Sequence, residues 1–245
     1  NQVFHLHNTT GQKITVVYKK LPKEQISDVN SVLEIDESDK VLSHELFQGG
    51  DQEVYNMSTD IFVVDTPYLI EKLEEEAAKE EPRKLRYVLR DLAVAENAFA
   101  YEYTGYLSNI HSVKAYFDAN LDMLESEKFY KLFAPNQKVY TKVKNEEPTY
   151  YATSSEVKVS QFASGSIVRG KVDHSVVSRN VDVAEGSSVD HSVLFPRVKV
   201  GKGATVEYAI VDKGVEIAEG VTIRGTENNP VVIKKGSVVT EDIVR

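Results

Sequence analysis

The last 95 residues of this 245-residue chain repeat an apolar pattern every 17 residues. Branched aliphatic residues and glycines fall in the same columns when Val177–Val193 is laid over Leu194–Ile210 and over the residues from Val211 onward. The columns are Val177/Leu194/Val211, Val181/Val198/Val215, Val183/Val200/Ile217, Val189/Val206/Ile223 and Gly186/Gly203/Gly220. A looser copy over Ser160–Val176 precedes them, with Val172 in the Val189 column.

This repeat, with apolar steps of 5, 6 and 6 residues, predicts a parallel β-helix with three short strands in each coil. Each side of a coil directs one branched aliphatic residue inward, and only the stacking of coils buries these residues. Glycine at the corners supplies backbone conformations that residues with a Cβ atom disfavour. A β-sandwich or a hairpin meander is the alternative, but neither requires a fixed 17-residue register.

The first 150 residues differ from this repeat in composition. They hold 17 basic residues, 26 acidic residues and 4 glycines, whereas residues 151–245 hold 12 basic residues, 12 acidic residues and 9 glycines. The formal net charge of −9 therefore lies entirely in the first segment. We predict an α/β domain over residues 1–130, a linker over residues 131–150 and the β-helix over residues 151–245.

The first segment has the patterns of a layered α/β domain. Lys13–Tyr18 is a β-branched and aromatic run and Ile61–Val64 is a short apolar run, so both are predicted strands. Thr66 is the predicted N-cap of a helix, and apolar residues that include Ile70 and Leu73 follow at helical spacing. Ser112 is the predicted cap of a further helix.

Composition excludes several classes of function. Because phosphate groups require a basic face, 38 Asp and Glu against 29 Lys and Arg disfavour nucleic acid and anionic membranes as partners. Neither a transmembrane run nor a signal peptide is recognised. The absence of cysteine excludes disulfides and thiolate chemistry and favours a cytoplasmic protein. The chain begins without methionine, which we interpret as the mark of a fragment.

Two motifs join the segments. Gly105–Val113 reads Gly-Tyr-Leu-Ser-Asn-Ile-His-Ser-Val, and Lys114–Leu124 reads Lys-Ala-Tyr-Phe-Asp-Ala-Asn-Leu-Asp-Met-Leu. Followed by hexapeptide coils, they resemble the ADP-glucose pyrophosphorylases (glucose-1-phosphate adenylyltransferases). In that family Gly-Tyr-Trp-x-Asp-Val-Gly-Thr-Ile leads into a helix reading Tyr-x-x-Ala-Asn-Met-Asp-Leu-Leu. The resemblance covers most of the chain and includes Val193–Leu194 and Ile210–Lys213.

The resemblance implies a fold and a reaction. The fold is the later part of a GT-A/Rossmann-like nucleotidyltransferase domain followed by a left-handed parallel β-helix of hexapeptide repeats. The family forms tetramers and makes ADP-glucose and pyrophosphate from ATP and glucose 1-phosphate, for glycogen or starch synthesis. Such chemistry requires a glycine-rich loop for the nucleotide, carboxylates for Mg²⁺ and a lysine for the sugar phosphate.

These groups are replaced in this chain. Four glycines in the first 150 residues cannot form the Gly-Gly-x-Gly-x-Arg-Leu loop, so we expect the N-terminal part of the nucleotidyltransferase domain to be missing. Val41–Gln48 lacks the lysine and proline of the family's sugar-phosphate motif, Phe-x-Glu-Lys-Pro. Where the family has the sugar-site sequence Ser-Met-Gly-Ile-Tyr, this chain has Asn56–Ile61, which begins at Asn56. The metal-binding aspartate falls on Asn109, whose neutral amide binds Mg²⁺ less well, and a neighbouring glycine falls on His111.

A retained scaffold with substituted active-site groups resembles the non-catalytic D-type subunit of glycogen biosynthesis. The resemblance implies a regulatory chain with no catalytic residue, no cofactor and no metal of its own. Such a chain acts in a homo- or hetero-oligomer with a catalytic ADP-glucose pyrophosphorylase subunit. Two alternatives stay open: an active sugar-nucleotide nucleotidyltransferase, and a hexapeptide-repeat acyltransferase with a histidine base in a trimer groove.

Four histidines have both a functional and a structural interpretation. His5 and His7 form a His-x-His pair, but no third ligand is near in sequence, so we interpret them as surface histidines. His174 and His191 recur at the repeat period. Each follows an inward-facing valine, where a corner or outward position is expected, and inheritance of the repeat explains the pair.

Two groups of charged residues are interpreted in the same way. Glu71–Glu81 is predicted to be the charged face of a helix and not a carboxylate site. Because the family is regulated by anionic metabolites near its domain junction, basic residues on the coils are candidates for an effector site. These are Arg169, Lys171, Arg179 and Arg197. Ordinary solubilising charge is the alternative interpretation.

Overall fold

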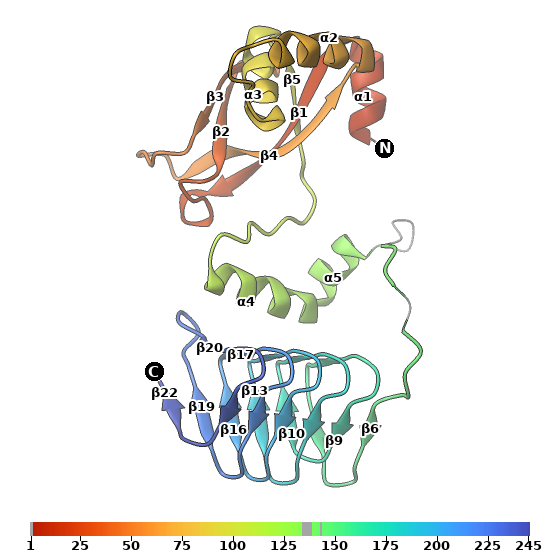
Figure 1. Ribbon diagram of the computed structural model, residues 1–245, viewed down its shortest axis with the longest axis vertical. Coiled ribbons are helices and arrows are strands. Elements are labelled where there is room, and N and C mark those ends of the chain that lie inside the picture. The colour runs from red at the N-terminus through yellow and green to blue at the C-terminus, as the bar shows by residue number, and fades with distance from the viewer. Residues whose placement is uncertain (1, 134–138, 143) are drawn as a thin grey trace. The chain divides into compact units, whose positions relative to one another are not determined.

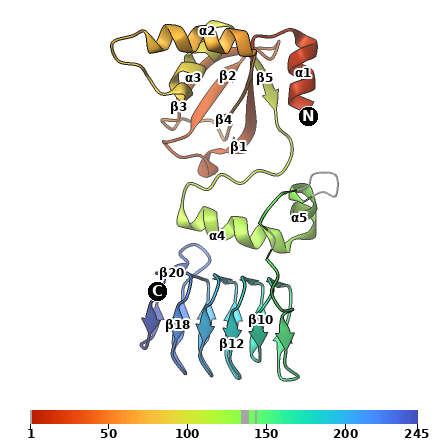
Figure 2. The same cartoon turned by 45° about the vertical axis from the view of Figure 1, so that its right-hand side comes forward.

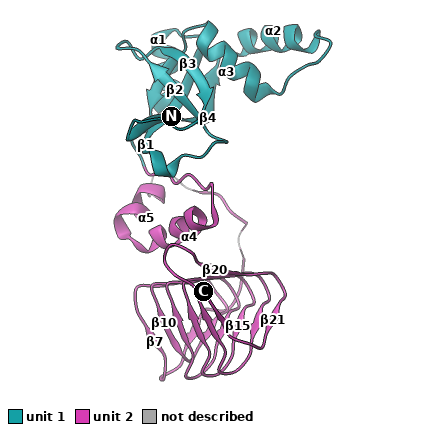
Figure 3. Ribbon diagram, turned by 90° about the vertical axis from the view of Figure 1, so that its left-hand side faces the viewer, with its two compact units in different colours: residues 1–105 teal, residues 106–245 magenta. Residues whose placement is uncertain are grey.

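The computed structural model describes residues 2–133, 139–142 and 144–245 (Figure 1). The chain forms two compact units, residues 1–105 (unit 1) and residues 106–245 (unit 2), which Figure 3 distinguishes by colour. Each unit has its own cluster of buried apolar residues. Within the described ranges, no helix combines the length and the apolar character needed to cross a membrane.

Unit 1 is built on a five-stranded mixed sheet in the order β3-β2-β4-β1-β5. The strands are β1 (Ile14–Pro22), β2 (Ser31–Ile35), β3 (Val41–Leu46), β4 (Val54–Val64) and β5 (Phe99–Glu102). The helices are α1 (Gln2–Thr10), α2 (Thr66–Ala77) and α3 (Leu85–Ala95), with a 3-10 turn, η1 (Lys23–Gln25), after β1. β1 pairs antiparallel with β4 and parallel with β5. The two predicted strands are confirmed as parts of β1 and β4.

The apolar core of unit 1 lies between the sheet and α3 (Figure 2). Ile14 and Val16, two residues apart on β1, face the same side of the sheet because side chains alternate along a strand. They pack with Ala93 of α3 and Ala100 of β5, and all four are at most 2% exposed. The small alanine side chains allow α3 to approach the sheet closely.

α2 is present as predicted, but its cap and its buried face differ from the prediction. The N-cap residue is Asp65 and not Thr66. Ile70 and Leu73, which the helical spacing places on an apolar face, are 52% and 37% exposed. The buried face instead carries Tyr68, whose hydroxyl donates to Glu96 Oε1 at 3.0 Å. The spacing of apolar residues located the helix and did not identify the face that it buries.

Unit 2 contains a parallel β-helix, as predicted. Its first sheet consists of β7 (Glu156–Val157), β10 (Lys171–Asp173), β13 (Ser188–Asp190), β16 (Thr205–Glu207), β19 (Thr222–Arg224) and β22 (Ile243–Val244). The second sheet consists of β8 (Gln161–Phe162), β11 (Val176–Val177), β14 (Val193–Leu194), β17 (Ala209–Val211) and β20 (Val231–Ile233). The third sheet consists of β6 (Tyr150–Tyr151), β9 (Ile167–Val168), β12 (Asp182–Val183), β15 (Lys199–Val200), β18 (Glu216–Ile217) and β21 (Val238–Val239).

The pairing of the coils confirms the 17-residue register. Val177 pairs with Leu194, which pairs with Val211 on the next coil. Val189 pairs with Val206 in the same way. All five side chains are at most 1% exposed, so the interior is a continuous aliphatic column, which is the arrangement that stacking of coils requires.

The earlier copy of the repeat is two residues shorter in one turn. Two residues connect β9 to β10, whereas four connect β12 to β13. Val177 consequently pairs with Phe162 and not with Ser160, the residue that a strict 17-residue repeat predicts. Gly170 lies in the short connection, where a Cβ atom would meet the carbonyl oxygen of Ser187 at 2.5 Å. The tight turn therefore requires glycine.

Two helices precede the β-helix in unit 2. They are α4 (Val113–Leu121) and α5 (Ser126–Leu132), joined by a 3-10 turn, η2 (Asp122–Leu124). The predicted cap of α4 is confirmed, since Ser112 Oγ accepts from the Ala115 N–H at 3.0 Å. Phe117 of α4 is 1% exposed and packs on Val193 and Ile210.

This contact places the division of the chain earlier than the sequence predicts. Residues up to 130 were expected in the α/β domain, but the structure groups the chain from Tyr106 onward with the β-helix, because α4 packs on the β-helix. α5 extends to Leu132, beyond the expected start of the linker. Residues 134–138 and 143 of the predicted linker lie outside the described residues.

Candidate functional site

One corner of the β-helix combines ionisable side chains with unusual backbone geometry. It lies where β10, β13 and β16 end and the chain turns toward the second sheet. The residues directly after these strands, His174, His191 and Tyr208, have positive φ angles of 39°, 39° and 47°. Histidine is one of the side chains enriched in this left-handed region. The predicted corner position of both histidines is confirmed.

A ladder of serine hydroxyls fixes the backbone at this corner. Ser160 Oγ accepts from the Ser175 N–H at 3.1 Å, and Ser175 Oγ accepts from the Ser192 N–H at 3.0 Å. Ser192 Oγ in turn accepts from the Ala209 N–H at 3.1 Å. The Ser175 hydroxyl donates to the Asp173 carbonyl oxygen at 2.6 Å, and the Ser192 hydroxyl donates to the Asp190 carbonyl oxygen at 2.8 Å. Since both serines are 0% exposed, the ladder satisfies buried polar groups and joins successive coils.

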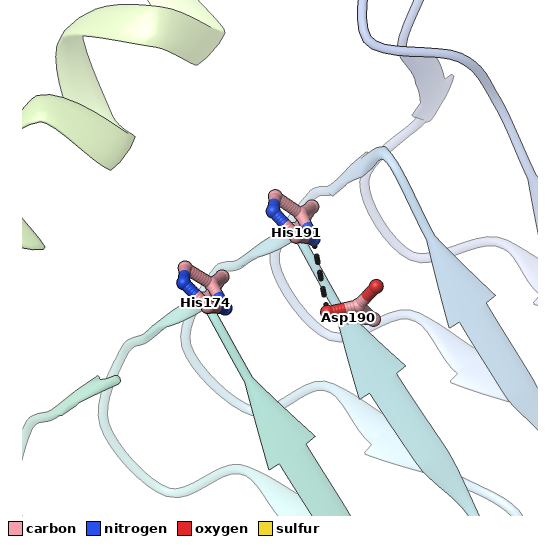
Figure 4. A group of neighbouring side chains, drawn as sticks. All are labelled: His174, Asp190 and His191. Carbon is pink, nitrogen blue, oxygen red and sulfur yellow. Dashed lines mark hydrogen bonds and ion pairs between the residues drawn. The ribbon is translucent and has the colours of Figure 1, made fainter. Parts of the chain in front are cut away.

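The two imidazole rings stack at this corner, as Figure 4 shows. Their centroids lie 4.7 Å apart with planes inclined by 3°, and Tyr208 continues the stack at 5.0 Å from His191. His191 Nδ1 lies 3.0 Å from Asp190 Oδ1, and His174 Nδ1 lies 2.8 Å from Asp173 Oδ1. Potential ligand atoms of His174, Asp190 and His191 all lie within 4.8 Å of one another. Over the residues that the structure describes, this is the only such group of three or more His, Asp or Glu side chains.

Unit 1 contains a buried polar group that the sequence did not single out. Arg90 of α3 is 6% exposed, and its Nη2 donates to both carboxylate oxygens of Asp60 at 3.1 Å. His44 of β3 is equally buried, with Nε2 3.0 Å from Ser31 Oγ. Burial, followed by the charge of Arg90, lowers the pKa of His44 to about 4, so its ring is neutral at neutral pH. Asp60 has a φ of 54°, which aspartate tolerates better than most residues.

No short motif could have identified this group, because its members come from three strands and a helix. His44 falls in the stretch Val41–Gln48, and Asp60 falls in the stretch Asn56–Ile61. The sequence resemblance predicts that these two stretches replace the family's sugar-phosphate and sugar-site motifs. Among the described residues, His44 Nδ1 and Arg90 Nε have no hydrogen-bond partner. The group is a neutral imidazole beside a paired guanidinium, and it contains no cysteine, serine–histidine–carboxylate chain or carboxylate cluster that indicates catalysis.

Comparison with known proteins shows what these two units are similar to. Residues 143–244 match a family model described as GlmU-like, C-terminal hexapeptide. The chain is 34% identical over 198 residues to the glycogen biosynthesis protein GlgD of Bacillus subtilis (strain 168), covering 80% of this chain and 55% of that protein. GlgD of Geobacillus stearothermophilus is 52% identical over 127 residues, which are 52% of this chain and 37% of that protein.

A catalytic family is matched as well. The glucose-1-phosphate adenylyltransferase of Bacillus mycoides (strain KBAB4) is 36% identical over 88 residues, which are 36% of this chain and 23% of that protein. Over these ranges the chain is similar to GlgD and to glucose-1-phosphate adenylyltransferases. The resemblance read from the motifs around α4 and from the hexapeptide repeat is thereby confirmed. The chain spans about half the length of the Bacillus subtilis GlgD.

The three positions that the sequence resemblance predicts to replace functional groups of the family, Asn109, His111 and Asn56, carry no carboxylate. Asn109 is half-buried and His111 is exposed, both in a segment without regular secondary structure. Asn56 lies on β4 in the other unit and donates through Nδ2 to the Leu33 carbonyl oxygen at 3.3 Å. Because Mg²⁺ prefers carboxylate oxygens, an amide and an imidazole do not fit the metal of that family.

Three of the four basic effector candidates are engaged in ion pairs. The side-chain nitrogens of Arg169, Lys171 and Arg179 lie 2.7, 3.0 and 3.6 Å from carboxylate oxygens. Arg197 is exposed and has a φ of 64°. An anionic effector at the first three residues would compete with these carboxylates. Effector binding on the coils stays a prediction.

Two residues interpreted as surface groups are buried. His7 of α1 is 3% exposed, with Nδ1 2.8 Å from Thr15 Oγ1, so only His5 of the pair is a surface histidine. Glu76, in the predicted charged face of α2, is 5% exposed and accepts from the Arg83 Nε at 3.0 Å. Hydrogen bonds from the side chain of Arg83, and next from that of Lys79, lower the pKa of Glu76 to about 2. The interpretation of His7 as a surface histidine was wrong, because Thr15 of the next element covers it. The glutamates in the charged face of α2 are exposed except for Glu76, which pairs with the nearby Arg83 and Lys79.

Proposed function

We propose that this chain is part of a regulatory, catalytically impaired relative of glucose-1-phosphate adenylyltransferase that acts in glycogen biosynthesis in the cytoplasm. The observation that carries the proposal is Asn109 at the position where the catalytic family has its metal-binding aspartate. A neutral amide oxygen does not offset the charge of Mg²⁺ as a carboxylate does. Without that ion, the charge that develops on the phosphates during nucleotidyl transfer lacks a main stabilising group.

The proposal is supported by the names of the matched relatives, two of which are called glycogen biosynthesis proteins. The match to the Bacillus subtilis protein covers 198 residues and so extends beyond the 140 residues of unit 2 into unit 1. A hexapeptide-repeat acyltransferase would leave this match in unit 1 unexplained. The alternative of an active nucleotidyltransferase is disfavoured by the side chain of Asn109.

We infer that the regulatory action requires assembly with a catalytic glucose-1-phosphate adenylyltransferase subunit. The first coil of the β-helix exposes apolar and aromatic side chains that a partner would cover, since Tyr150, Tyr151 and Val157 are 61%, 47% and 39% exposed. The strands that carry them, β6 and β7, are edge strands of their sheets. Exposed apolar residues at a sheet edge favour association with another chain.

An assay of ADP-glucose synthesis tests the proposal. The full-length protein that contains this chain is supplied with ATP, glucose 1-phosphate and Mg²⁺, alone and together with the catalytic subunit of the same organism. We expect no synthesis by the protein alone and a higher rate from the mixture than from the catalytic subunit with heat-unfolded protein. Synthesis by the protein alone at the rate of the catalytic subunit would overturn the catalytic impairment. An unchanged rate in the mixture would overturn the regulatory role.

A further inference from the structure

We propose that His174, Asp190 and His191 form a binding site for one divalent transition-metal ion of the zinc class. The three side chains supply two imidazole nitrogens and a carboxylate oxygen, the ligand types that Zn²⁺ accepts together. Their potential ligand atoms lie within 4.8 Å of one another, at a corner that solvent reaches. The inference concerns unit 2 alone and does not rest on the proposed function.

The geometry is close to that of a zinc site and requires only side-chain movement. Metal–ligand bonds of about 2.0–2.2 Å in a tetrahedron set the ligand atoms about 3.3–3.6 Å apart. Asp190 Oδ1 and His191 Nδ1 are already 3.0 Å apart. The rings of His174 and His191 stack in parallel, so a shared ion requires them to tilt toward each other about χ1 and χ2. Their side chains are 45% and 34% exposed, which leaves room for this movement.

The backbone beneath the three side chains is held in place. β10 and β13 pair directly in register, with Asp173 opposite Asp190. The ladder formed by Ser175 and Ser192 fixes the residues that follow each histidine. The site is therefore built on paired strands and a hydrogen-bonded corner, and rigid elements hold metal ligands more accurately than mobile loops do.

The charge around the corner favours a cation. Asp173, Asp190 and Glu207 occupy one line across three neighbouring strands, and like charges directly opposite each other destabilise a sheet. Glu207 forms an ion pair with Arg224, so the line is neutralised by a permanent cation at one end only. A divalent ion bound by Asp190 would offset the charge at the other end.

The chemical class of the ion follows from the ligands. Imidazole suits zinc, nickel, cobalt and copper, whereas Mg²⁺ prefers carboxylate, carbonyl and water oxygens. The site would therefore not replace the Mg²⁺ site of the catalytic family. It also departs from the expectation that this chain holds no metal. Repeat inheritance explains why Asp-His-Ser recurs at residues 173–175 and 190–192; the proposal rests on the closeness of the potential ligand atoms of His174, Asp190 and His191.

Calorimetric titration of the tag-free 245-residue chain with Zn²⁺ tests the site. We expect one ion per chain, with binding weakened at least about tenfold in His174→Asn, His191→Asn and Asp190→Asn, because each variant removes one ligand. Asparagine tolerates positive φ, so the histidine variants keep the corner conformation. His5→Asn is the matched control, since it removes an exposed histidine of α1, and its affinity should equal that of the wild type.

A second measurement keeps the test independent of folding in the variants. Co²⁺ bound to the wild-type chain should show visible absorption bands of a four-coordinate ion, and Zn²⁺ should raise the unfolding temperature of the wild type but not of His191→Asn. Binding should also weaken as the pH falls, because protons compete for the imidazoles. No saturable Zn²⁺ binding, a six-coordinate Co²⁺ spectrum, or an affinity of the three ligand variants equal to that of the wild type would each overturn the proposal.

Discussion

Replacing Ser192 with alanine tests the serine ladder that fixes the corner of the β-helix. The Ser192 hydroxyl accepts from the Ala209 N–H at 3.1 Å and donates to the Asp190 carbonyl oxygen at 2.8 Å. In Ser192→Ala the Asp190 carbonyl keeps its bond from the Tyr208 N–H at 3.2 Å. The Ala209 N–H, in a residue that is 0% exposed, loses its acceptor where water does not reach.

The expected loss follows from that buried donor. An unsatisfied buried donor costs about 1–3 kcal/mol, so we expect the free energy of unfolding of unit 2 to fall by about 2 kcal/mol. Ser187→Ala is the matched control, because Ser187 is also 0% exposed and its hydroxyl donates to the Ala184 carbonyl oxygen at 2.6 Å. In the described part of the chain no backbone N–H donates to Ser187 Oγ, so its removal should cost about 1 kcal/mol or less.

Urea-dependent hydrogen exchange, read by mass spectrometry in peptides that cover β13 to β17, measures this loss. The peptides report on unit 2 separately from unit 1, whose unfolding need not occur at the same urea concentration. We expect the unfolding midpoint of Ser192→Ala to be lower than that of Ser187→Ala, with the fastest exchange in the peptide that contains Ala209. Equal midpoints in the two variants would show that the ladder does not stabilise the corner.

Two further substitutions test other contacts. Because the folded-state pKa of Glu76 is about 2 against an ordinary 4.5, its bond to Arg83 stabilises unit 1 above pH 4.5, and this stabilisation is lost as the pH falls toward 2. Urea unfolding should therefore show a gap in stability between wild type and Glu76→Gln that narrows over this range, and a gap independent of pH would contradict the pairing. Phe117→Ala should destabilise unit 2 by about 3 kcal/mol and speed hydrogen exchange in α4, whereas Tyr130→Ala, at a side chain 63% exposed, should leave both unchanged.

The interior of the β-helix could be predicted residue by residue because every coil meets the same geometric requirement. Val189, Val206 and Ile223 occupy one column in the sequence and pair in the structure. The outside of the coils follows no such rule. The shortened turn at Gly170 shifts the register of the first coils, and a glycine alone does not reveal how many residues a turn contains. The serine ladder was missed because apolar periodicity says nothing about buried hydroxyls.

Unit 1 was less predictable because its buried polar groups find partners in distant segments. Arg90 and Asp60 are 30 residues apart, and His7 and Thr15 belong to different elements. A polar residue in a helix pattern reads as exposed unless its partner is known, and the partner is set by the tertiary fold. The candidate metal site shows the same limit: recurrence identified its histidines, but only the pairing of β10 with β13 brings His174 next to Asp190 and His191.

The residues of α4 that match the Tyr-x-x-Ala-Asn motif, and Phe117 among them, make packing contacts and local hydrogen bonds, which is compatible with the proposed loss of catalysis. Phe117 fills the contact with the β-helix, Tyr116 stacks on Phe195 at 6.4 Å, and Asn120 Nδ2 donates to the Tyr116 carbonyl oxygen at 2.8 Å. None of these contacts requires a metal or a substrate. In the predicted alignment, Asn109 stands where the catalytic family has its metal-binding aspartate. Under the proposed function, packing contacts of this kind keep a surface for assembly, while Asn109 removes one of the groups that the catalytic family uses.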